Sequence, residues 1–167
     1  AQLGIADTDL LKSQGHIQTP VADFYYADIC KPEELEQCFT GEKIDVIIHL
    51  AALTGVRQSL LTPQAYIDSN VKGFVNLLEC ANKHGVKHII YASSSSVYGL
   101  NRETPYTELQ RTDTPISVYA ASKKADELLA HTSSQLYNIN LIGLRLFTVY
   151  GRWTRPDWSP RPHRPRP

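Results

Sequence analysis

Three short apolar runs, separated by helix-like segments, constrain the fold of this chain more than any other feature. The clearest run is Asp45-Val-Ile-Ile-His-Leu-Ala-Ala52, and two more occupy residues 86–92 and 141–147. A short continuous apolar run is typical of a strand buried on both faces of a parallel sheet. We therefore expect strands at these three places.

The segments between the runs have helical periodicity. Residues 68–83 carry apolar side chains at helical spacing and stop before Gly85, and residues 117–136 form a second such segment. Upstream, residues 23–29 predict a further strand, and residues 32–39 a helix that opens on a proline. Alternating strands and helices predict an α/β fold, a doubly wound parallel sheet with helices on both faces.

The composition is that of an ordinary globular domain. Of the 167 residues, 42% are hydrophobic and 20% charged, and the formal net charge is zero, so nothing favours nucleic acid or an anionic membrane as a partner. No apolar run approaches the roughly 18 residues of a membrane helix, and no signal peptide is visible. The three cysteines are odd in number and have no metal-ligand spacing, which predicts a reducing, cytoplasmic location and no metal site.

Residues 152–167 differ from the rest of the chain. They hold five arginines against one aspartate, and their prolines forbid a regular helix. We predict a folded domain over residues 1–151 and a disordered Pro/Arg-rich tail over residues 152–167. Such a tail can bind an SH3-like partner or nucleic acid, so a non-enzymatic interaction protein stays open as an alternative.

Chemically active side chains follow the predicted strands. Asp28, residues 49–54, residues 93–96 and Thr148 all lie at strand ends. Sites in parallel α/β sheets lie at the carboxyl ends of the strands. These residues should therefore converge on one edge of the sheet.

A tyrosine and a lysine begin the predicted helix over residues 117–136. Tyr119 precedes Lys123 by four residues, which places the phenol and the ammonium on one helix face. If a strand end brings the serines of residues 93–96 to that face, three groups can share protons with a substrate hydroxyl. This pattern predicts an acid/base site, with an exposed helix pair lacking any chemistry as the alternative.

Six motifs in order support a family resemblance. They are Asp28-Ile29, His49-Leu-Ala-Ala52, Asn70-Val-Lys-Gly73 with Asn76-Leu-Leu-Glu79, Ser93-Ser-Ser-Ser-Val-Tyr-Gly99, Tyr119-Ala-Ala-Ser-Lys123 and Leu144-Arg-Leu-Phe-Thr-Val-Tyr-Gly151. A lone Tyr-x-x-x-Lys is common by chance, whereas the ordered set is specific. The chain resembles the nicotinamide-dependent sugar-nucleotide epimerases and dehydratases, the extended branch of the short-chain dehydrogenase/reductase superfamily. The resemblance implies a partial Rossmann-like fold and NAD as cofactor.

The resemblance also implies three catalytic residues. Tyr119, as a phenolate, would take the proton of the substrate 4-hydroxyl while hydride leaves C4 for the nicotinamide. Lys123 would supply the positive charge that a phenol needs to ionise near neutral pH, and would bind the nicotinamide ribose. Ser94 would hydrogen-bond the same sugar oxygen. The 4-keto intermediate would then rotate and regain the hydride on its other face, so that the cofactor is not consumed.

Other motif positions have binding roles in the family. The implied cofactor-binding residues, besides Tyr119 and Lys123, are Asp28 and Ile29 at the adenine and Leu50, Ala51 and Ala52. Asn70 would contact substrate. Plainer interpretations stay open: Asp28 as a helix cap, His49 as a core histidine, Asn76 and Arg145 as structural hydrogen-bond donors, and the serines as a strand end.

The residues after Ser94 favour one branch of the family. Dehydratases carry Asp-Glu there, whereas Ser95 and Ser96 suit a substrate carboxylate, as do Thr148 and Arg155. The chain therefore most resembles the UDP-glucuronate 4-epimerases, which implies a nucleotide-sugar substrate and a homodimer. A UDP-glucuronate decarboxylase and a 4-epimerase of neutral UDP-sugars remain alternatives.

Two parts of the family pattern have no counterpart here. The Gly-x-x-Gly-x-x-Gly turn for the cofactor pyrophosphate is not found, and residues 1–20 offer at most the end of a helix and a loop. Arg152 and Thr154 replace an expected Pro and Gly, and the similarity ends near Asp157. We expect a fragment of a longer protein, without the first two strands and the C-terminal substrate subdomain, that binds NAD weakly and is inactive alone.

Overall fold

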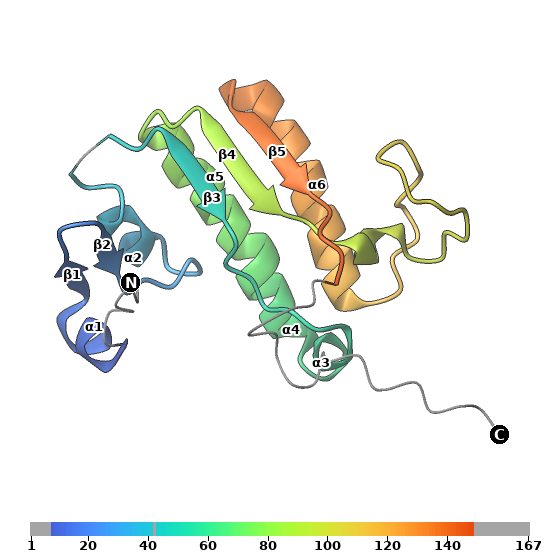
Figure 1. The fold of residues 1–167 in the computed structure, drawn as a ribbon, viewed down its shortest axis with the longest axis horizontal. Helices are drawn as coiled ribbons and strands as arrows, with labels where there is room; N and C mark the ends of the chain where they lie inside the picture. The colour runs from blue at the N-terminus through green and yellow to red at the C-terminus, as the bar shows by residue number, and fades with distance from the viewer. Residues whose placement is uncertain (1–7, 42, 149–167) are drawn as a thin grey trace.

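A three-stranded parallel sheet forms the centre of the computed structural model, which describes residues 8–41 and 43–148 (Figure 1). The strands β3 (Val46–His49), β4 (His88–Ala92) and β5 (Asn140–Leu144) lie side by side in that order. Ile48 pairs with Ile90, and Ile90 with Ile142, so one apolar row crosses the sheet. The three predicted strands are confirmed, each shorter than its apolar run.

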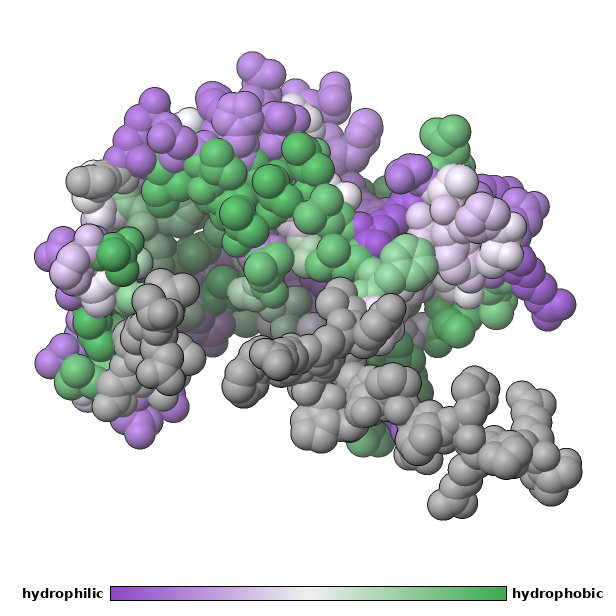
Figure 2. All heavy atoms as spheres, viewed as in Figure 1, coloured by the Kyte–Doolittle hydropathy of each residue, from purple (hydrophilic) through white to green (hydrophobic). Residues whose placement is uncertain are grey.

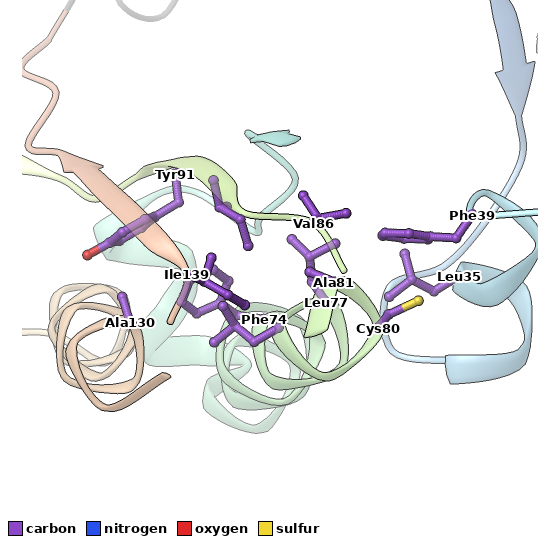
Figure 3. Close-up of a cluster of buried hydrophobic side chains, with 12 residues drawn as sticks. Leu35, Phe39, Phe74, Leu77, Cys80, Ala81, Val86, Tyr91, Ala130 and Ile139 are labelled. Carbon is purple, nitrogen blue, oxygen red and sulfur yellow. The ribbon is translucent and has the colours of Figure 1, made fainter. Parts of the chain in front are cut away.

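Two helices cover one face of this sheet. The helices α5 (Gly73–Lys83) and α6 (Val118–Tyr137) lie behind the strands in Figure 1. Side chains alternate between the faces of a strand, and Ile89 and Tyr91 of β4 point to the helices and are buried. Figure 3 shows Tyr91 above Phe74 of α5, with Ala130 of α6 beside them. The core therefore lies between the sheet and these two helices.

The opposite face of the sheet is apolar and exposed. Val46, Ile48, Leu50, Ile142 and Leu144 are between 41% and 65% exposed, and Figure 2 shows a continuous hydrophobic patch over these strands. Within residues 8–41 and 43–148, helices thus cover one face only, and the expected second helical layer is not seen. Helix α2 (Pro32–Gln37) packs against α5.

The N-terminal segment forms a separate hairpin. Helix α1 (Thr8–Gln14) leads into β1 (His16–Gln18), which pairs antiparallel with β2 (Asp23–Tyr25). The prediction that residues 23–29 form a strand of the parallel sheet is therefore wrong. The hairpin is closed by Thr19, whose Oγ1 accepts the Ala22 N–H at 3.0 Å, and the rings of His16 and Tyr25 stack at 4.3 Å.

The connection from β3 to α5 is more helical than the sequence suggested. Helices α3 (Val56–Leu61) and α4 (Pro63–Tyr66) precede a π-helical segment, η1 (Ile67–Lys72), that continues into α5. The predicted helix over residues 68–83 thus begins with a π turn, a form that often marks functional sites. After β4 the chain makes a short 3₁₀ helix, η2 (Ser95–Tyr98). None of the helices in the described part of the chain is long and apolar enough to span a membrane.

Candidate active site

A cavity of about 460 Å³ lies at the carboxyl ends of the central strands, a volume within the usual range for ligand sites. The residues that follow β3, β4 and β5 therefore converge as predicted, whereas Asp28 lines a different cavity. The predicted site residues that line this cavity are Leu50, Ala52, Ser94, Ser95, Ser96, Tyr119, Lys123 and Thr148.

The serine cluster reaches the cavity because the chain turns sharply after β4. Ser94 is extended and caps η2, and its Oγ accepts the Ser96 N–H at 3.2 Å. The Ser95 N–H donates to the carbonyl of Leu146 at 2.9 Å, which joins the turn to the segment after β5. Ser93 instead donates to Glu127 Oε1 at 2.8 Å and ties the strand end to α6.

The first turns of α6 present the phenol and the ammonium together. Ser117 caps the helix, its Oγ accepting the Ala120 N–H at 3.0 Å. Tyr119 is half-buried, and its ring meets the edge of Tyr66 at 6.3 Å between centroids. Lys123 is buried one turn further on. The alternative of an exposed pair on a helix surface is thereby excluded.

Lys123 has a buried partner that the sequence analysis did not identify. Its ammonium donates to Asp126 Oδ2 at 3.1 Å, and both side chains are almost fully buried. Burial raises the pKa of Asp126 to about 6, although the charge of Lys123 opposes the rise. The other carboxylate oxygen of Asp126 has no hydrogen-bond partner among the described residues. The i, i+3 spacing of a lysine and an acid on one helix was the available signal.

Asn70 and Tyr66 hold the loop after β3 against α6. The Asn70 amide accepts the Leu53 N–H at 2.8 Å and donates to the carbonyl of Leu53 at 3.1 Å and to Ser122 Oγ at 3.0 Å. The Tyr66 hydroxyl donates to the Thr54 carbonyl at 2.7 Å. Asn70 does not line the cavity, and its role as a substrate ligand stays a prediction. Its observed role is to fix the loop beside Tyr119.

A second cavity, of about 420 Å³, adjoins the first at Ala52. It is lined by Asp28 and Ile29, which the family resemblance assigned to the adenine of the cofactor, and by Ala51, which the resemblance assigned to the cofactor more generally. Asp28 Oδ1 accepts the Cys30 N–H at 2.9 Å, and this bond lowers the pKa of the carboxyl group. The cap position of α2 is Lys31, so the interpretation of Asp28 as a helix cap is wrong.

The sequence of the chain matches a known protein family. The model of the NAD dependent epimerase/dehydratase family matches residues 5–164. The chain belongs to this family. The match continues past Asp157, where the sequence analysis placed the end of the resemblance.

Individual epimerases and their relatives are similar to the chain. Protein CapI of Staphylococcus aureus is 51% identical over 127 residues, which are 76% of this chain and 38% of CapI. UDP-glucuronate 4-epimerase 6 of Arabidopsis thaliana is 58% identical over 114 residues, 68% of this chain and 25% of that protein. The solved Thermus thermophilus UDP-glucose 4-epimerase, in complex with NAD, gives a TM-score of 0.68 at 29% identity over 77% of this chain and 42% of that chain. The chain spans less than half the length of each.

The two adjoining cavities fit the cofactor of this epimerase/dehydratase family. A dinucleotide has two ends, and here one cavity holds the reactive side chains while the other holds an exposed carboxylate. Ala52, which lines both cavities, has only a methyl side chain. Asp28, Ile29 and Ala51 would hold the adenosine end, and Leu50, Ala52, Tyr119 and Lys123 the nicotinamide end.

The remaining predicted residues have structural contacts or lie outside the described residues. His49 is buried and stacks on Phe74 at 5.3 Å, and burial lowers its pKa to about 4, as expected of a neutral core histidine. Arg145 donates to both carboxylate oxygens of Glu127, at 2.8 and 3.0 Å, and Asn76 donates to the Ile29 carbonyl at 2.9 Å. Arg155 and the whole Pro/Arg-rich tail, residues 152–167, lie outside the described residues.

Proposed function

We propose that this chain supplies the catalytic groups of a nucleotide-sugar 4-epimerase that interconverts UDP-glucuronate and UDP-galacturonate. The observation that carries the proposal is the convergence of Ser94, Tyr119 and Lys123 on one cavity, with Ser95 and Ser96 beside them. The 58% identity to a UDP-glucuronate 4-epimerase supports the choice of substrate.

The side chains divide the proton chemistry between them. Tyr119 removes the proton of the 4-hydroxyl as C4 is oxidised and returns it after the 4-keto sugar has turned. Lys123 stabilises the phenolate, and the Ser94 hydroxyl donates a hydrogen bond to the same sugar oxygen. Leu50, Ala52, Tyr119 and Lys123 would hold the nicotinamide end of NAD, which when bound would supply reversible hydride transfer at C4 without net oxidation. An epimerase of this kind needs all three residues in one place, as they are here.

The cavity also supplies donors for the substrate carboxylate. A uronic acid oxidised at C4 is a β-keto acid and loses carbon dioxide easily, so the carboxylate must be held in an orientation that disfavours cleavage. The hydroxyls of Ser95, Ser96 and Thr148 line the cavity and can donate to it. We assign Arg155 to the same carboxylate, with a charge-assisted bond.

A chimera with a relative tests this proposal. The 114-residue segment that matches UDP-glucuronate 4-epimerase 6 replaces the corresponding part of that enzyme, and the product is incubated with NAD and UDP-glucuronate. We expect UDP-galacturonate by NMR, with the parent enzyme as control. Release of carbon dioxide with a pentose product would favour the alternative of a UDP-glucuronate decarboxylase. Turnover of UDP-glucose but not of UDP-glucuronate would favour a 4-epimerase of neutral UDP-sugars. A folded chimera that binds NAD and converts none of these overturns the proposal.

We expect the 167-residue chain alone to differ from the chimera in NAD binding and turnover. The sequence contains no Gly-x-x-Gly-x-x-Gly turn for the pyrophosphate. We therefore propose that this chain alone binds NAD weakly and does not turn over, and that a homodimer forms in a protein of the relatives' length. Calorimetric titration with NAD checks the first statement, and micromolar or tighter binding contradicts it.

A further inference from the structure

Three side chains with metal-binding atoms meet away from the active site. Glu36, Cys80 and His84 place one ligand atom each within 4.8 Å of the others, and no other such group occurs among residues 8–41 and 43–148. None of the three lines either of the two cavities. The cluster is therefore separate from the chemistry of the epimerase site.

The cluster joins two helices. Cys80 and His84, four residues apart, lie on one face at the end of α5, and Glu36 comes from α2. Figure 3 shows the sulfur of Cys80 directed toward α2, next to Leu35 and Phe39. His84 is also in contact with the ring of Phe39 at 5.2 Å. The three ligands are thus supported by packed neighbours rather than by loops.

The distances are near those of a zinc site. Cys80 Sγ lies 3.6 Å from Glu36 Oε2, and His84 Nε2 lies 2.6 Å from Glu36 Oε1. Tetrahedral zinc with Zn–S of about 2.3 Å and Zn–O and Zn–N of about 2.1 Å separates sulfur from oxygen by about 3.6 Å and oxygen from nitrogen by about 3.4 Å. The sulfur already has this spacing from Oε2, whereas the imidazole contacts the other oxygen, Oε1, so the carboxylate and the imidazole must adjust for one oxygen to join both at the metal.

We propose that Glu36, Cys80 and His84 form a Zn²⁺ site with a water molecule as fourth ligand. Thiolate, imidazole and carboxylate are ligands that zinc takes together. Zn²⁺ replaces the thiol proton, which passes to solvent, and the thiolate and carboxylate charges balance the metal. Lys83, whose ammonium donates to Glu36 Oε1 at 2.8 Å, is 66% exposed and turns away as the metal binds.

A metal here clamps α2 to α5. Helix α2 follows the segment that carries Asp28 and Ile29, so the clamp secures one wall of the second cavity. Metal that binds only the folded state stabilises it. We expect Zn²⁺ at a free concentration about a hundredfold above its Kd to raise the Tm by about 5–10 °C.

Metal titration of the 167-residue chain tests the site. Zn²⁺ is titrated against a chromophoric chelator, and Co²⁺ is used to detect thiolate ligation by its charge-transfer absorption. We expect Cys80→Ser, His84→Ala and Glu36→Gln each to weaken Zn²⁺ binding at least about tenfold, since even residues behind the ligands have effects of this size. Lys83→Gln, which removes the competing ammonium, should tighten it.

Matched controls separate this site from adventitious binding. Cys30→Ser and His88→Ala, outside the cluster, should leave Zn²⁺ affinity and the Co²⁺ absorption unchanged. Circular dichroism checks that each variant folds. If Cys80→Ser does not fold, the test rests on His84→Ala and Glu36→Gln, because His84 is exposed and Glu36 is half-buried. The proposal is overturned if the Co²⁺ complex shows no thiolate absorption, or if His84→Ala and Glu36→Gln bind Zn²⁺ as tightly as the wild type.

Discussion

At the scale of single residues, the buried pair of Lys123 and Asp126 distinguishes this site. The ammonium of Lys123, to which we assign a role in the proposed chemistry, lies 3.1 Å from a carboxylate oxygen inside the protein. Burial works against the ionised form of Asp126 more strongly than Lys123 favours it, which is why its pKa is raised to about 6. Protonation of Asp126 therefore frees the charge of Lys123.

The raised pKa of Asp126 predicts a pH-dependent stability. A carboxyl whose pKa is higher in the folded state takes up a proton on folding, so its contribution is fully present below about pH 4 and is lost as the pH rises through about 6. A shift of about two units corresponds to about 3 kcal/mol. Urea unfolding of the wild type and Asp126→Asn from pH 4 to 7 should show this fall only in the wild type. Parallel curves would show that Asp126 has no such role.

The phenol of Tyr119 should be required for turnover. In the chimera described above, Tyr119→Phe should lower interconversion at least about 100-fold, because no other phenol or carboxylate lines the described cavity. Binding of UDP-glucuronate should change less than about threefold, since the ring remains. Turnover is measured by NMR and binding by calorimetry. Comparable turnover by the variant would remove Tyr119 from the role of base.

At the scale of elements, the start of α6 sets the position of the catalytic side chains. Ser117→Ala removes the cap that accepts the Ala120 N–H and should lower the free energy of unfolding by about 1 kcal/mol. Denaturant titration measures the loss. Ser134→Ala, at a half-buried position near the other end of the same helix, is the control and should have a smaller effect. An equal loss in both variants would contradict a specific cap.

The elements built from continuous apolar runs were predictable, and those closed by turns were not. Residues 45–52 and 86–92 carry enough Val and Ile to identify strands, although one face of the sheet is exposed among the described residues. The hairpin of β1 and β2 has three-residue strands rich in polar groups, and it depends on Thr19, whose side-chain bond no periodicity reveals. Helix α3 begins at Val56 after Gly55, whose φ is 107°, and this glycine offers no side-chain cap that the sequence could indicate.

The side chains that line the candidate site could be predicted from the sequence, whereas the buried acids beside them could not. Tyr119, Lys123 and the serines have motif spacing, and strand ends must meet at one edge of a sheet. Asp126 and Glu127 follow Lys123 at helical spacing, yet an acid there is usually a solvated surface group. Only the packing of α6 on the sheet shows that both are withdrawn from water and paired.

At the scale of the whole molecule, the exposed face of the sheet governs behaviour in solution. Contiguous apolar patches of this kind mark contact surfaces or lead to association. We predict that the 167-residue chain self-associates and binds an apolar dye in its folded state. The double substitution Ile48→Ser and Ile142→Ser should lower dye fluorescence at least about twofold.

A single exposed residue away from the sheet is the control for this face. Leu109 is 98% exposed and belongs to none of the strands, so Leu109→Ser should leave both the fluorescence and the sedimentation profile unchanged. Equal effects of Leu109→Ser and the sheet variant would contradict the assignment of the patch.

The crossover from β4 through α6 to β5 holds Ser94, Tyr119, Lys123 and Thr148 within one continuous stretch of sequence. Asp28 and Ala51, which line the second cavity, come from a separate, earlier stretch. In genetic terms, Ser94, Tyr119 and Lys123 are inherited as one block, together with Ser95, Ser96 and Thr148. Recombination upstream of residues 93–148 would exchange the segment that carries Asp28 and Ala51 and would leave this block intact.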